Sequence, residues 1–344
     1  MALRLRRLLV TGGAGFIGSA FVRQRLKGDP EIEIIVLDKL TYAGSEENLA
    51  EVAADRRLRF VKGDICDTRL VDQLAGEVDA IVNFAAESHV DRSLIDAGSF
   101  VQTDVYGTYV LLEAAKRHRL QRFLQVSTDE VYGHVKEGRS VEEDRLSPRS
   151  PYSATKAAAE MLVNAYHASF ELPTLITRGS NTYGPYQFPE KIIPLFITNA
   201  LQDLPLPIYG RGSAVRDYLY VDDHASAIAR VLWKGELGSA YNVATGREVS
   251  GIDVADTILR LCGKPSSLKH YVKDRPGHDY RYALETKRLR PLGFAPAVPF
   301  EEGMKLTVEW YRTHEHWWRP RKGADFWRFY RDNYRGLPAN AIPG

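Results

Sequence analysis

Short apolar segments alternate with longer segments of helical period along the first half of the chain. The runs "RLLVTG", "EIIVLD", "LRFVKGD", "DAIVNFAAE" and "RFLQVST" are apolar with little alternation, which predicts strands buried on both faces. Between them, "GFIGSAFVRQRL" and "TYVLLEAAKRHR" have the period of amphipathic helices. This order predicts an α/β fold, a doubly wound parallel sheet with helices on both faces.

The alternation continues to about residue 178, and the composition then changes. Proline and glycine become dense in "NTYGPYQFPEKIIP" and "LPLPIYGRG", which predicts a smaller, loop-rich lobe over residues 179–315. We expect residues 1–178 to form the α/β domain, which the chain could re-enter from its C-terminal half. Residues 316–344 form a tail rich in arginine and aromatic residues. A helix docked by its aromatic face is the simplest interpretation of this tail, and covering a cleft or self-association are the alternatives.

Composition describes an ordinary globular protein. Hydrophobic residues make up 44% of the 344 positions and charged residues 26%. The 46 Lys and Arg residues nearly balance the 44 Asp and Glu residues, which gives a formal net charge of +2. Because nucleic-acid-binding proteins usually carry an excess of positive charge, this balance argues against a nucleic-acid partner.

The N-terminus and the cysteines bear on location. "MALRLRRLLVTGG" has basic residues before apolar ones, but its apolar run "LLV" is far shorter than a secretory signal requires. No stretch approaches the length that spans a membrane. Cys66 and Cys262 match no metal-ligand spacing and suit a reducing compartment. We therefore expect a cytoplasmic enzyme or binding protein with no membrane partner and no metal site.

A glycine-rich turn predicts a dinucleotide site. "VTGGAGFIG" places Gly12, Gly15 and Gly18 after the first predicted strand and at the start of the first predicted helix. Such glycines let the chain turn tightly and bring helix N–H groups to a pyrophosphate. Asp38 ends the second predicted strand about 20 residues later, where a carboxylate binds ribose hydroxyls and repels a 2′-phosphate. The pattern predicts a Rossmann-type domain for NAD rather than NADP, although Lys39 partly offsets this preference.

A tyrosine and a lysine predict redox chemistry on a sugar. "SPYSATKAAAEM" places Tyr152 and Lys156 four residues apart, on one face of a predicted helix. The lysine ammonium and the positive nicotinamide ring would stabilise the phenolate and lower the pKa of the tyrosine. Such a tyrosine can take a proton from a sugar hydroxyl while hydride passes to NAD. Thr128 ends the fifth predicted strand, where open parallel sheets bind ligands, and can donate to the same oxygen.

Two adjacent acids follow that strand. "STDEVYG" places Asp129 and Glu130 side by side. Oxidation of a sugar at C4 makes the C5 proton acidic, so a base can remove it while a nearby acid expels the C6 hydroxyl as water. Adjacent side chains in a strand point to opposite faces, so both acids can face the sugar only if the strand breaks into a turn there. Their mutual repulsion would help to keep one protonated and the other ionised.

Further motifs carry a family resemblance. "TGGAGFIG", "DKLTYAG", "AAESHVDRS", "STDEVYG", "SPYSATKA", "NTYGPYQFPEKIIP", "LPIYGRG", "RDYLYVDDHA" and "DRPGHDYRYA" occur in this order between about residues 8 and 310. Together they resemble the extended short-chain dehydrogenase/reductase family and, within it, the dTDP-glucose 4,6-dehydratases. The resemblance implies a Rossmann domain with a smaller C-terminal lobe that binds a nucleoside-diphosphate sugar. It also implies tightly bound NAD that is regenerated in each turnover.

The same resemblance implies a reaction and an assembly. The reaction is that of a lyase: dTDP-glucose becomes the 4-keto-6-deoxy sugar by C4 oxidation, loss of water across C5 and C6, and hydride return to C6. Tyr152 would be the base at O4, Lys156 its partner and Thr128 a donor to O4. Asp129 would be the general acid and Glu130 the base at C5. Family members are usually homodimers, joined here through helices near 99–118 and 152–170.

The binding residues also follow from the resemblance. Cofactor contacts carry over to Gly12, Gly15, Phe16, Ile17, Gly18, Asp38, Lys39, Thr41, Asp64, Ile65, Ala85, Ala86, Thr103, Tyr152, Lys156 and Thr182. Substrate contacts carry over to Ser88, Thr128, Asn181, Lys191, Ile192, Pro207, Ile208, Tyr209, Arg216, Asp274, Arg275 and His278.

Several of these residues have structural alternatives. Arg216 and Arg275 suit a diphosphate but also a surface ion pair. Tyr209 suits stacking on a base but also a core position. Asn181 could cap a turn, and His89 is expected to be a structural hydrogen-bonding residue rather than a catalyst.

Departures and competing functions remain open at this point. The family usually reads Cys-Ser-Asn-Asn-Tyr-Gly where this chain has Gly179 and Thr182, and an asparagine that contacts the nucleotide where it has Gly251. The base could therefore be thymine, uracil or another. A nucleotide-sugar 4-epimerase usually has small residues in place of the two acids, and a UDP-glucuronate decarboxylase has one acid preceded by a serine. A non-catalytic NAD-binding sensor often loses the tyrosine or the lysine. Asp129 distinguishes a dehydratase from these alternatives, because only water elimination needs an acid at O6.

Overall fold

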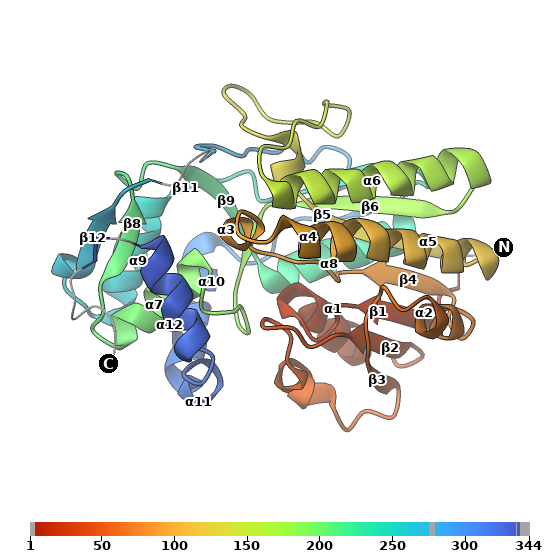
Figure 1. Cartoon of the computed structure of the whole chain (residues 1–344), viewed down its shortest axis with the longest axis horizontal. Coiled ribbons are helices and arrows are strands. Elements are labelled where there is room, and N and C mark those ends of the chain that lie inside the picture. The colour runs from red at the N-terminus through yellow and green to blue at the C-terminus, as the bar shows by residue number, and fades with distance from the viewer. Residues whose placement is uncertain (1–3, 275–278, 335, 338–344) are drawn as a thin grey trace.

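The computed structural model describes residues 4–274, 279–334 and 336–337. Its main sheet has seven parallel strands in the order β10-β6-β5-β4-β1-β2-β3 (Figure 1). The strands are β1 Arg7–Thr11, β2 Glu33–Asp38, β3 Leu58–Lys62, β4 Ala80–Asn83, β5 Arg122–Thr128, β6 Thr174–Gly179 and β10 Ala240–Val243. The order reverses between β1 and β4, and such a switch point is where doubly wound sheets open a binding crevice.

The predicted strands are confirmed, with one correction. β2 and β5 begin and end at the residues of the predicted runs. β3 is wrongly expected to be buried on both faces: it forms the edge of the sheet, and its residues are half-buried or exposed. An edge strand has a neighbour on one side only, which its hydrophobic pattern did not reveal. β10 joins the sheet from the C-terminal half, so the chain re-enters it.

Helices cover both faces of this sheet. On one face α1 (Phe16–Gly28) packs against α8 (Val221–Lys234) over a large apolar core. On the other face α2 (Thr68–Ala75), α5 (Thr108–Arg117) and α6 (Pro151–Phe170) enclose a second core. The doubly wound α/β fold is therefore confirmed. The shorter helical elements are η1 Glu46–Val52, α3 Val90–Ser93, α4 Ala97–Phe100, the π-helix η2 Val101–Gly107 and η3 Asp129–Tyr132.

The smaller lobe lies beyond the carboxyl ends of the large sheet (Figure 1). Less loop-rich than expected, it holds two small sheets and a helical core. Its strands are β7 Asn181–Tyr183, β8 Leu206–Tyr209, β9 Val215–Tyr220, β11 Glu248–Ser250 and β12 Lys269–Val272. Its helices are α7 Ile192–Leu201, α9 Gly251–Cys262, α10 Phe300–Thr313, α11 Glu315–Trp318 and α12 Ala324–Asn333, with short turns η4 Ser266–Leu268 and η5 Arg290–Leu292.

The aromatic tail docks onto this lobe as α11 and α12. Trp317, Trp318, Phe326 and Tyr330 are buried in the core that the lobe builds from α7, α9 and α10. A buried phenylalanine such as Phe326 contributes about 1.5–3 kcal/mol to folding. Docking by the aromatic face is therefore confirmed for the described part of the tail.

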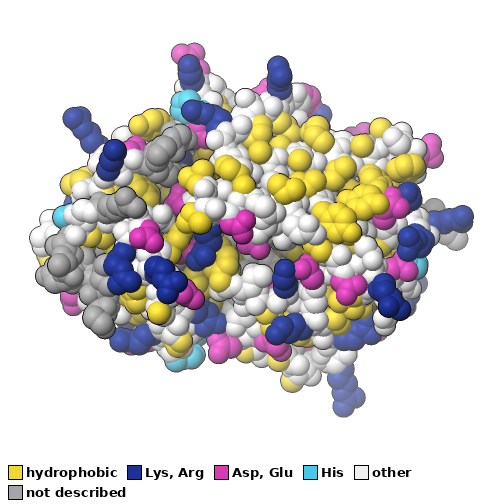
Figure 2. Space-filling model, viewed as in Figure 1, with side chains coloured by type: hydrophobic (Ala, Val, Ile, Leu, Met, Phe, Trp, Pro, Cys, Tyr) yellow, Lys and Arg dark blue, Asp and Glu magenta, His cyan; other side chains and the backbone are white. Residues whose placement is uncertain are grey.

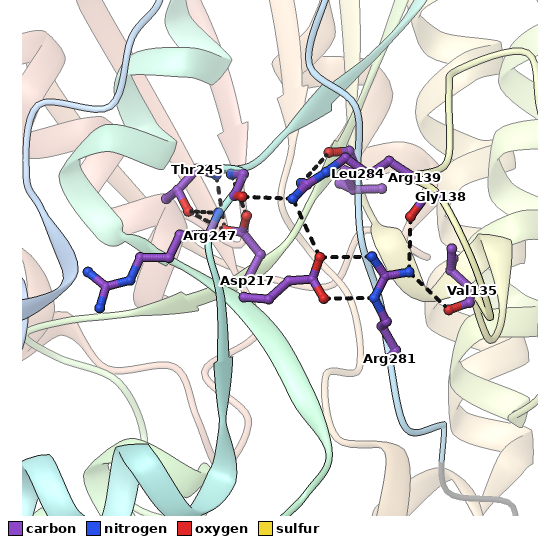
Figure 3. A network of polar contacts seen from close by, with 10 residues as sticks. Val135, Gly138, Arg139, Asp217, Thr245, Arg247, Arg281 and Leu284 are labelled. Atoms are coloured by element: carbon purple, nitrogen blue, oxygen red, sulfur yellow. Dashed lines mark hydrogen bonds and ion pairs between the residues drawn. The ribbon is translucent and has the colours of Figure 1, made fainter.

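A polar network ties the loop after β5 to the smaller lobe (Figure 3). Glu248 on β11 accepts hydrogen bonds from Nε and Nη2 of Arg281 at 2.7 and 2.8 Å. Arg281 also donates to the Gly138 carbonyl at 2.9 Å, and Arg139 donates to the carbonyl of Gly246 in the loop before β11 at 2.8 Å. Because the segment that contains Gly138 and Arg139 follows the turn at the end of β5, the network holds the smaller lobe over the strand ends.

Among the described residues, no helix has the length and apolar character needed to cross a membrane. The same residues contain no cluster of three or more His, Cys, Asp or Glu side chains that could hold a metal ion.

Candidate active site

A cavity lies at the carboxyl ends of β1, β2, β4, β5 and β6, where the smaller lobe faces the sheet. Residues that line it include six with a buried polar atom that makes no hydrogen bond within the described chain. These atoms are Ser127 Oγ, Asp129 Oδ2, Asn181 Oδ1, Gln187 Oε1, Glu190 Oε1 and His224 Nε2. Buried polar atoms normally have partners, so this cluster indicates where the polar groups of a ligand bind.

The glycine turn after β1 forms one end of the cavity. Gly12 has φ +66°, and a Cβ there would lie 2.6 Å from the backbone nitrogen of Ala85. A Cβ on Gly18 would collide with the Gly12 carbonyl oxygen. α1 begins at Phe16, so its first N–H groups face the cavity that Gly15, Phe16 and Ile17 line. A close-fitting turn before a helix N-terminus fits a pyrophosphate.

The acid at the end of β2 also lines the cavity. Asp38 accepts hydrogen bonds from the backbone N–H of Ala14 and Leu40, each at 2.9 Å, while burial raises its pKa. Lys39 forms an ion pair with Asp64 at 2.7 Å, so its ammonium is directed to a different carboxylate. The remaining predicted cofactor residues on this side also line the cavity, namely Lys39, Thr41, Asp64, Ile65, Ala85, Ala86 and Thr103.

The strand carrying the paired acids breaks where the sequence requires it. β5 ends at Thr128, and the 3-10 turn η3 begins at Asp129. The Thr128 hydroxyl accepts from the Glu130 N–H at 3.3 Å and so caps the turn. Asp129 and Glu130 consequently both line the cavity instead of pointing to opposite faces.

The two acids have different environments. Asp129 is 3% exposed, whereas Glu130 is half-buried. Burial and then the neighbouring Glu130 charge raise the pKa of Asp129 well above its ordinary value, against an opposing effect of Arg216. A carboxyl group held protonated beside a more accessible one is the arrangement that separates an acid from a base.

Tyr152 and Lys156 both lie on α6 and both line the same cavity. Ser150 caps the helix and Pro151 occupies its first position, so the first turn, with Tyr152, is firmly placed. Lys156 Nζ donates to the carbonyl of Val126 on β5 at 2.8 Å. Burial lowers the pKa of Lys156, and the carboxylates of Asp104 and Glu160 oppose this effect.

The expected lowering of the tyrosine pKa does not occur in the protein alone. Burial raises the pKa of Tyr152 well above its usual value, and the carboxylates of Glu130 and Asp104 add to the effect. A hydrogen bond with Thr128 acts in the opposite direction. The nearby carboxylates disfavour the phenolate, so an added positive charge, such as that of an oxidised nicotinamide ring, would lower the pKa of this tyrosine.

The predicted substrate residues divide into two sets. Ser88, Thr128, Asn181 and Lys191 line the cavity, and Lys191 Nζ donates to the carbonyl of Ser88. The cavity lining does not include Ile192, Pro207, Ile208, Tyr209, Arg216 or Asp274. Arg275 and His278 lie outside the described residues. Asn181 does not cap a turn through its side-chain oxygen, which is buried without a hydrogen bond.

Arg216 and Tyr209 make contacts within the protein. Arg216 is 8% exposed, donates to the carbonyls of Val215 and Asp279 at 2.8 and 2.6 Å, and stacks over Tyr282 at 4.5 Å. The surface ion pair offered as its alternative is therefore wrong. The Tyr209 ring packs on that of Tyr334 with centroids 5.3 Å apart.

The cavity residues that the sequence reasoning missed include three with a buried polar atom that has no hydrogen bond within the described chain: Gln187, Glu190 and His224. Glu190 is buried, and its Oε2 accepts from Nη2 of Arg92 at 2.9 Å. All three stand inside the motifs "NTYGPYQFPEKIIP" and "RDYLYVDDHA". The only sequence signal for these residues was their polar character within a family motif. Position in a motif does not show which side chains point into the cavity.

His224 contacts both positions near β6, Gly179 and Thr182, at which this chain differs from the usual family sequence. Its Nδ1 lies 2.7 Å from the Thr182 hydroxyl, and its ring fills the space that a side chain at Gly179 would need. Burial lowers the pKa of His224 to about 4, so the ring is neutral at physiological pH. Thr182, expected near the nicotinamide, lines the cavity together with this histidine.

His89 has the structural role expected of it. It precedes α3, and its Nδ1 accepts from the N–H of Asp91 at 3.2 Å.

Comparison with known proteins agrees with this geometry. The family model described as GDP-mannose 4,6 dehydratase matches residues 9–307. A dTDP-glucose 4,6-dehydratase from Streptomyces niveus is 51% identical over 324 residues, which cover 93% of this chain and 96% of that protein. The crystal structure of the dTDP-glucose 4,6-dehydratase DesIV from Streptomyces venezuelae with NAD bound has a TM-score of 0.90 and 50% identity, and covers 92% of this chain and 100% of that one.

A UDP-glucose 4-epimerase is more distant but has the same fold. The structure of the Thermus thermophilus enzyme in complex with NAD has a TM-score of 0.81 and 33% identity, over 89% of this chain and 99% of that one. Fold alone therefore does not separate dehydratase from epimerase, and the side chains of the site must do so. The matched model and these relatives establish that the chain belongs to the GDP-mannose 4,6-dehydratase family of the extended short-chain dehydrogenase/reductases.

Proposed function

We propose that this protein is an NAD-dependent dTDP-glucose 4,6-dehydratase that produces the 4-keto-6-deoxy sugar nucleotide. The observation that carries the proposal is the turn at the end of β5, through which Asp129 and Glu130 both face the cavity that Tyr152 lines. A sugar epimerised at C4 needs a base at O4 alone, whereas water loss needs a second base and an acid. This site has all three groups within one cavity.

The residues of the first lobe fit a dinucleotide. The Gly12 and Gly18 turn supplies the close backbone approach, and Asp38 lies where ribose hydroxyls bind. Lys39, paired with Asp64, leaves the preference of Asp38 for NAD in place. When bound, NAD supplies the chemistry of accepting hydride from C4 and returning it to C6.

Substitution of Gly18 by alanine should empty the cofactor site. A Cβ there collides with the Gly12 carbonyl, so the turn must open and the purified protein should contain little NAD, measured by absorbance after denaturation. Gly28→Ala at the other end of α1 is the matched control, since the nearest atom to its Cβ lies 4.0 Å away. Equal NAD content in the two variants would contradict this cofactor assignment.

Three side chains act on the sugar C4 hydroxyl in this proposal. Thr128 donates to O4 and so orients it, and Tyr152 takes the O4 proton as hydride leaves C4. Lys156, held by the Val126 carbonyl, is positioned to offset the phenolate charge that burial and two carboxylates otherwise disfavour.

The paired acids act after this oxidation. Glu130, the more accessible of the two, removes the C5 proton that the new C4 carbonyl has made acidic. Asp129, held protonated by burial and by Glu130, gives its proton to the C6 hydroxyl, which leaves as water. Hydride returns to C6 and the proton held by Glu130 returns to C5, which completes the product. The proton that Tyr152 gained and the proton that Asp129 lost balance, and exchange with solvent restores both groups.

The alternatives are disfavoured by particular residues. An epimerase or a decarboxylase has no use for an acid at position 129, and a non-catalytic sensor has no use for a retained Tyr152–Lys156 pair. The base of the nucleotide is less constrained, because Arg275 and His278 lie outside the described residues and Tyr209 packs on Tyr334. Thymine is preferred here because the two relatives named above with about half of their residues identical to this chain are dTDP-glucose 4,6-dehydratases.

A single product analysis tests the proposed function. The purified protein is incubated separately with dTDP-, UDP-, CDP- and GDP-glucose, and each product is analysed by mass spectrometry. Loss of one water from dTDP-glucose alone is the expected result. Unchanged mass together with a new sugar isomer would identify an epimerase, and loss of water from another donor would correct the base.

We also propose that the chain forms a homodimer. Val101, Tyr106, Tyr109, Met161 and Phe170 are each more than 40% exposed and belong to η2, α5 and α6. Figure 2 shows hydrophobic side chains gathered over the region of α4, α5 and α6. A contiguous apolar surface of this kind is typical of an interface, and two helices from each copy would pack as a bundle.

The dimer proposal predicts the effect of one charge. Met161→Glu should convert a dimer of about twice the chain mass into a monomer, as measured by sedimentation equilibrium, because the carboxylate would be desolvated in the bundle. Leu306→Glu is the control, since Leu306 is a comparably exposed apolar residue on α10. A dimer that survives Met161→Glu, or a wild-type monomer, argues against this interface.

The division into residues 1–178, 179–315 and 316–344 and the cytoplasmic location complete the proposal. The separate core of the smaller lobe supports a second lobe, and Trp317, Trp318, Phe326 and Tyr330 of the tail belong to the same core.

A further inference from the structure

The C-terminal helix α12 contacts the first lobe as well as its own. Phe326 and Tyr330 point into the core of the smaller lobe. Phe329, on a different side of the helix, packs edge-on against the His89 ring with centroids 5.3 Å apart. It also lies under the guanidinium of Arg92, whose Cζ is 4.7 Å from the ring centroid. His89 and Arg92 belong to the α3 region of the first lobe, so α12 bridges the two lobes.

Arg92 connects this bridge to the cavity. Its guanidinium carbon lies over two rings, 4.0 Å from the Tyr42 centroid and 4.7 Å from the Phe329 centroid. From that position Nε and Nη2 both donate to Glu190 Oε2, at 3.1 and 2.9 Å. A guanidinium held between aromatic faces keeps its planar fork in one orientation. The Phe329 ring is therefore one of the two aromatic contacts that can fix the direction of these hydrogen bonds.

Glu190 accepts the hydrogen bonds of Arg92 and is the last residue in this series of contacts. Its side chain is only 1% exposed and lines the cavity next to Lys191. While Oε2 is held by Arg92, Oε1 is buried without a hydrogen bond of ordinary geometry to any other described residue, and the Tyr42 hydroxyl interacts with this carboxylate. A buried, oriented carboxylate in a binding cavity can accept a hydrogen bond from a hydroxyl of the bound ligand.

We infer that Phe329 is a positioning residue for the substrate site, acting through Arg92 on the Glu190 carboxylate. This inference rests on the proposed function for its kinetic consequences and on geometry for the contacts themselves. The helix end supports it independently: Tyr334, just beyond α12, packs on Tyr209, and the carbonyl of Gly336 lies 3.0 Å from His270 Nε2 on β12. The tail is thus anchored on both sides of the contact that Phe329 makes.

The main variant is Phe329→Ala. Without the ring, Arg92 loses one of its two aromatic faces and Glu190 its fixed orientation, so kcat for water loss should fall by about tenfold or more, as misplacement of a site group does. KM for the sugar nucleotide should also rise, because Glu190 lines the substrate cavity, and NAD content should not change, because the dinucleotide cradle is untouched. Phe329→Tyr keeps the aromatic face and should restore kcat.

Trp327→Ala is the matched control. Trp327 is also an aromatic residue of α12, but it packs against Phe326 and Tyr330 within its own lobe. Its loss should lower the melting temperature and leave kcat near the wild-type value. If the two alanine variants lose kcat in parallel, Phe329 only stabilises the fold and the inference is overturned.

A double-mutant cycle tests the route through Arg92. When one residue acts through another, removal of both costs no more than removal of the nearer one. The kcat of Phe329→Ala combined with Arg92→Ala should therefore equal that of Arg92→Ala alone. Independent, multiplying losses would overturn the inference.

A second readout keeps this inference separate from the proposed function. Deuterium uptake of the peptide around Glu190 should rise in Phe329→Ala and not in Trp327→Ala, with no substrate present. If the wild type fails to dehydrate any sugar nucleotide but this difference is observed, the proposed function fails and the positioning chain stands. If deuterium uptake is equal in the wild type and in Phe329→Ala, then Phe329 does not position Glu190 through Arg92, whatever the activity.

Discussion

Replacement of Asp129 by asparagine is expected to separate sugar oxidation from water loss. Asparagine has nearly the same shape but cannot give a proton to the C6 hydroxyl, so elimination should slow by about 10²–10³-fold, as loss of a general acid does. Oxidation at C4 depends on Tyr152 and Thr128 and should continue. Bound NAD should therefore become reduced on mixing with dTDP-glucose and stay reduced, measured as absorbance at the NADH band.

The pH dependence of the wild type follows from the same carboxyl group. Burial and Glu130 raise the pKa of Asp129, so its protonated form persists above the ordinary range of an aspartate. The rate of elimination should fall as pH rises through that raised pKa, and Asp129→Asn should lack this fall. An Asp129→Asn variant that cannot reduce its bound NAD would show that the acid acts earlier than proposed.

The stability of this variant should change in the opposite direction to its activity. A carboxyl group whose pKa is raised in the folded state contributes stability below its unfolded pKa of about 4, and this contribution is lost as pH rises. At neutral pH the buried carboxyl therefore lowers the free energy of unfolding, and asparagine removes this cost. Asp129→Asn should melt at a higher temperature than the wild type at pH 7 and at the same temperature near pH 3, measured by calorimetry.

Replacement of Tyr152 by phenylalanine is expected to stop the reaction at its first step. Phenylalanine fills the same space on α6 but cannot take the O4 proton, so oxidation at C4 should slow by about 10²–10⁴-fold. No NADH absorbance should develop with dTDP-glucose, in contrast to Asp129→Asn. The affinity for dTDP, measured by calorimetry, should be close to that of the wild type, since the phenol makes its decisive contact only with the reacting hydroxyl.

A control separates this effect from the loss of a buried hydroxyl. Tyr132 is also buried close to the end of β5, where its hydroxyl donates to Asn242 Oδ1 at 2.8 Å. Tyr132→Phe should cost stability without blocking C4 oxidation. Rapid reduction of NAD in Tyr152→Phe would exclude this tyrosine as the base at O4.

Local pattern determined a large part of this protein. The apolar runs placed five strands of the large sheet, because strands and helices have different hydrophobic periods along the chain. The glycine turn, Asp38, Tyr152 and Lys156 lie in short motifs whose function depends on spacing within one element. The turn at Asp129 and Glu130 also followed from sequence, since two adjacent acids can share a face only where a strand ends.

Other features were decided by the tertiary structure alone. That β3 is an edge strand depends on which strands pair, and that His224 fills the space beside Gly179 depends on how α8 packs against β6. The Phe329, Arg92 and Glu190 contacts join segments that are far apart in sequence, and no local period encodes them. The same holds for Arg216, whose guanidinium is engaged by backbone carbonyls. The sequence specifies each side chain and the local structure around it. The contacts of that side chain with distant residues form only when the two lobes pack, because burial and charge act through space.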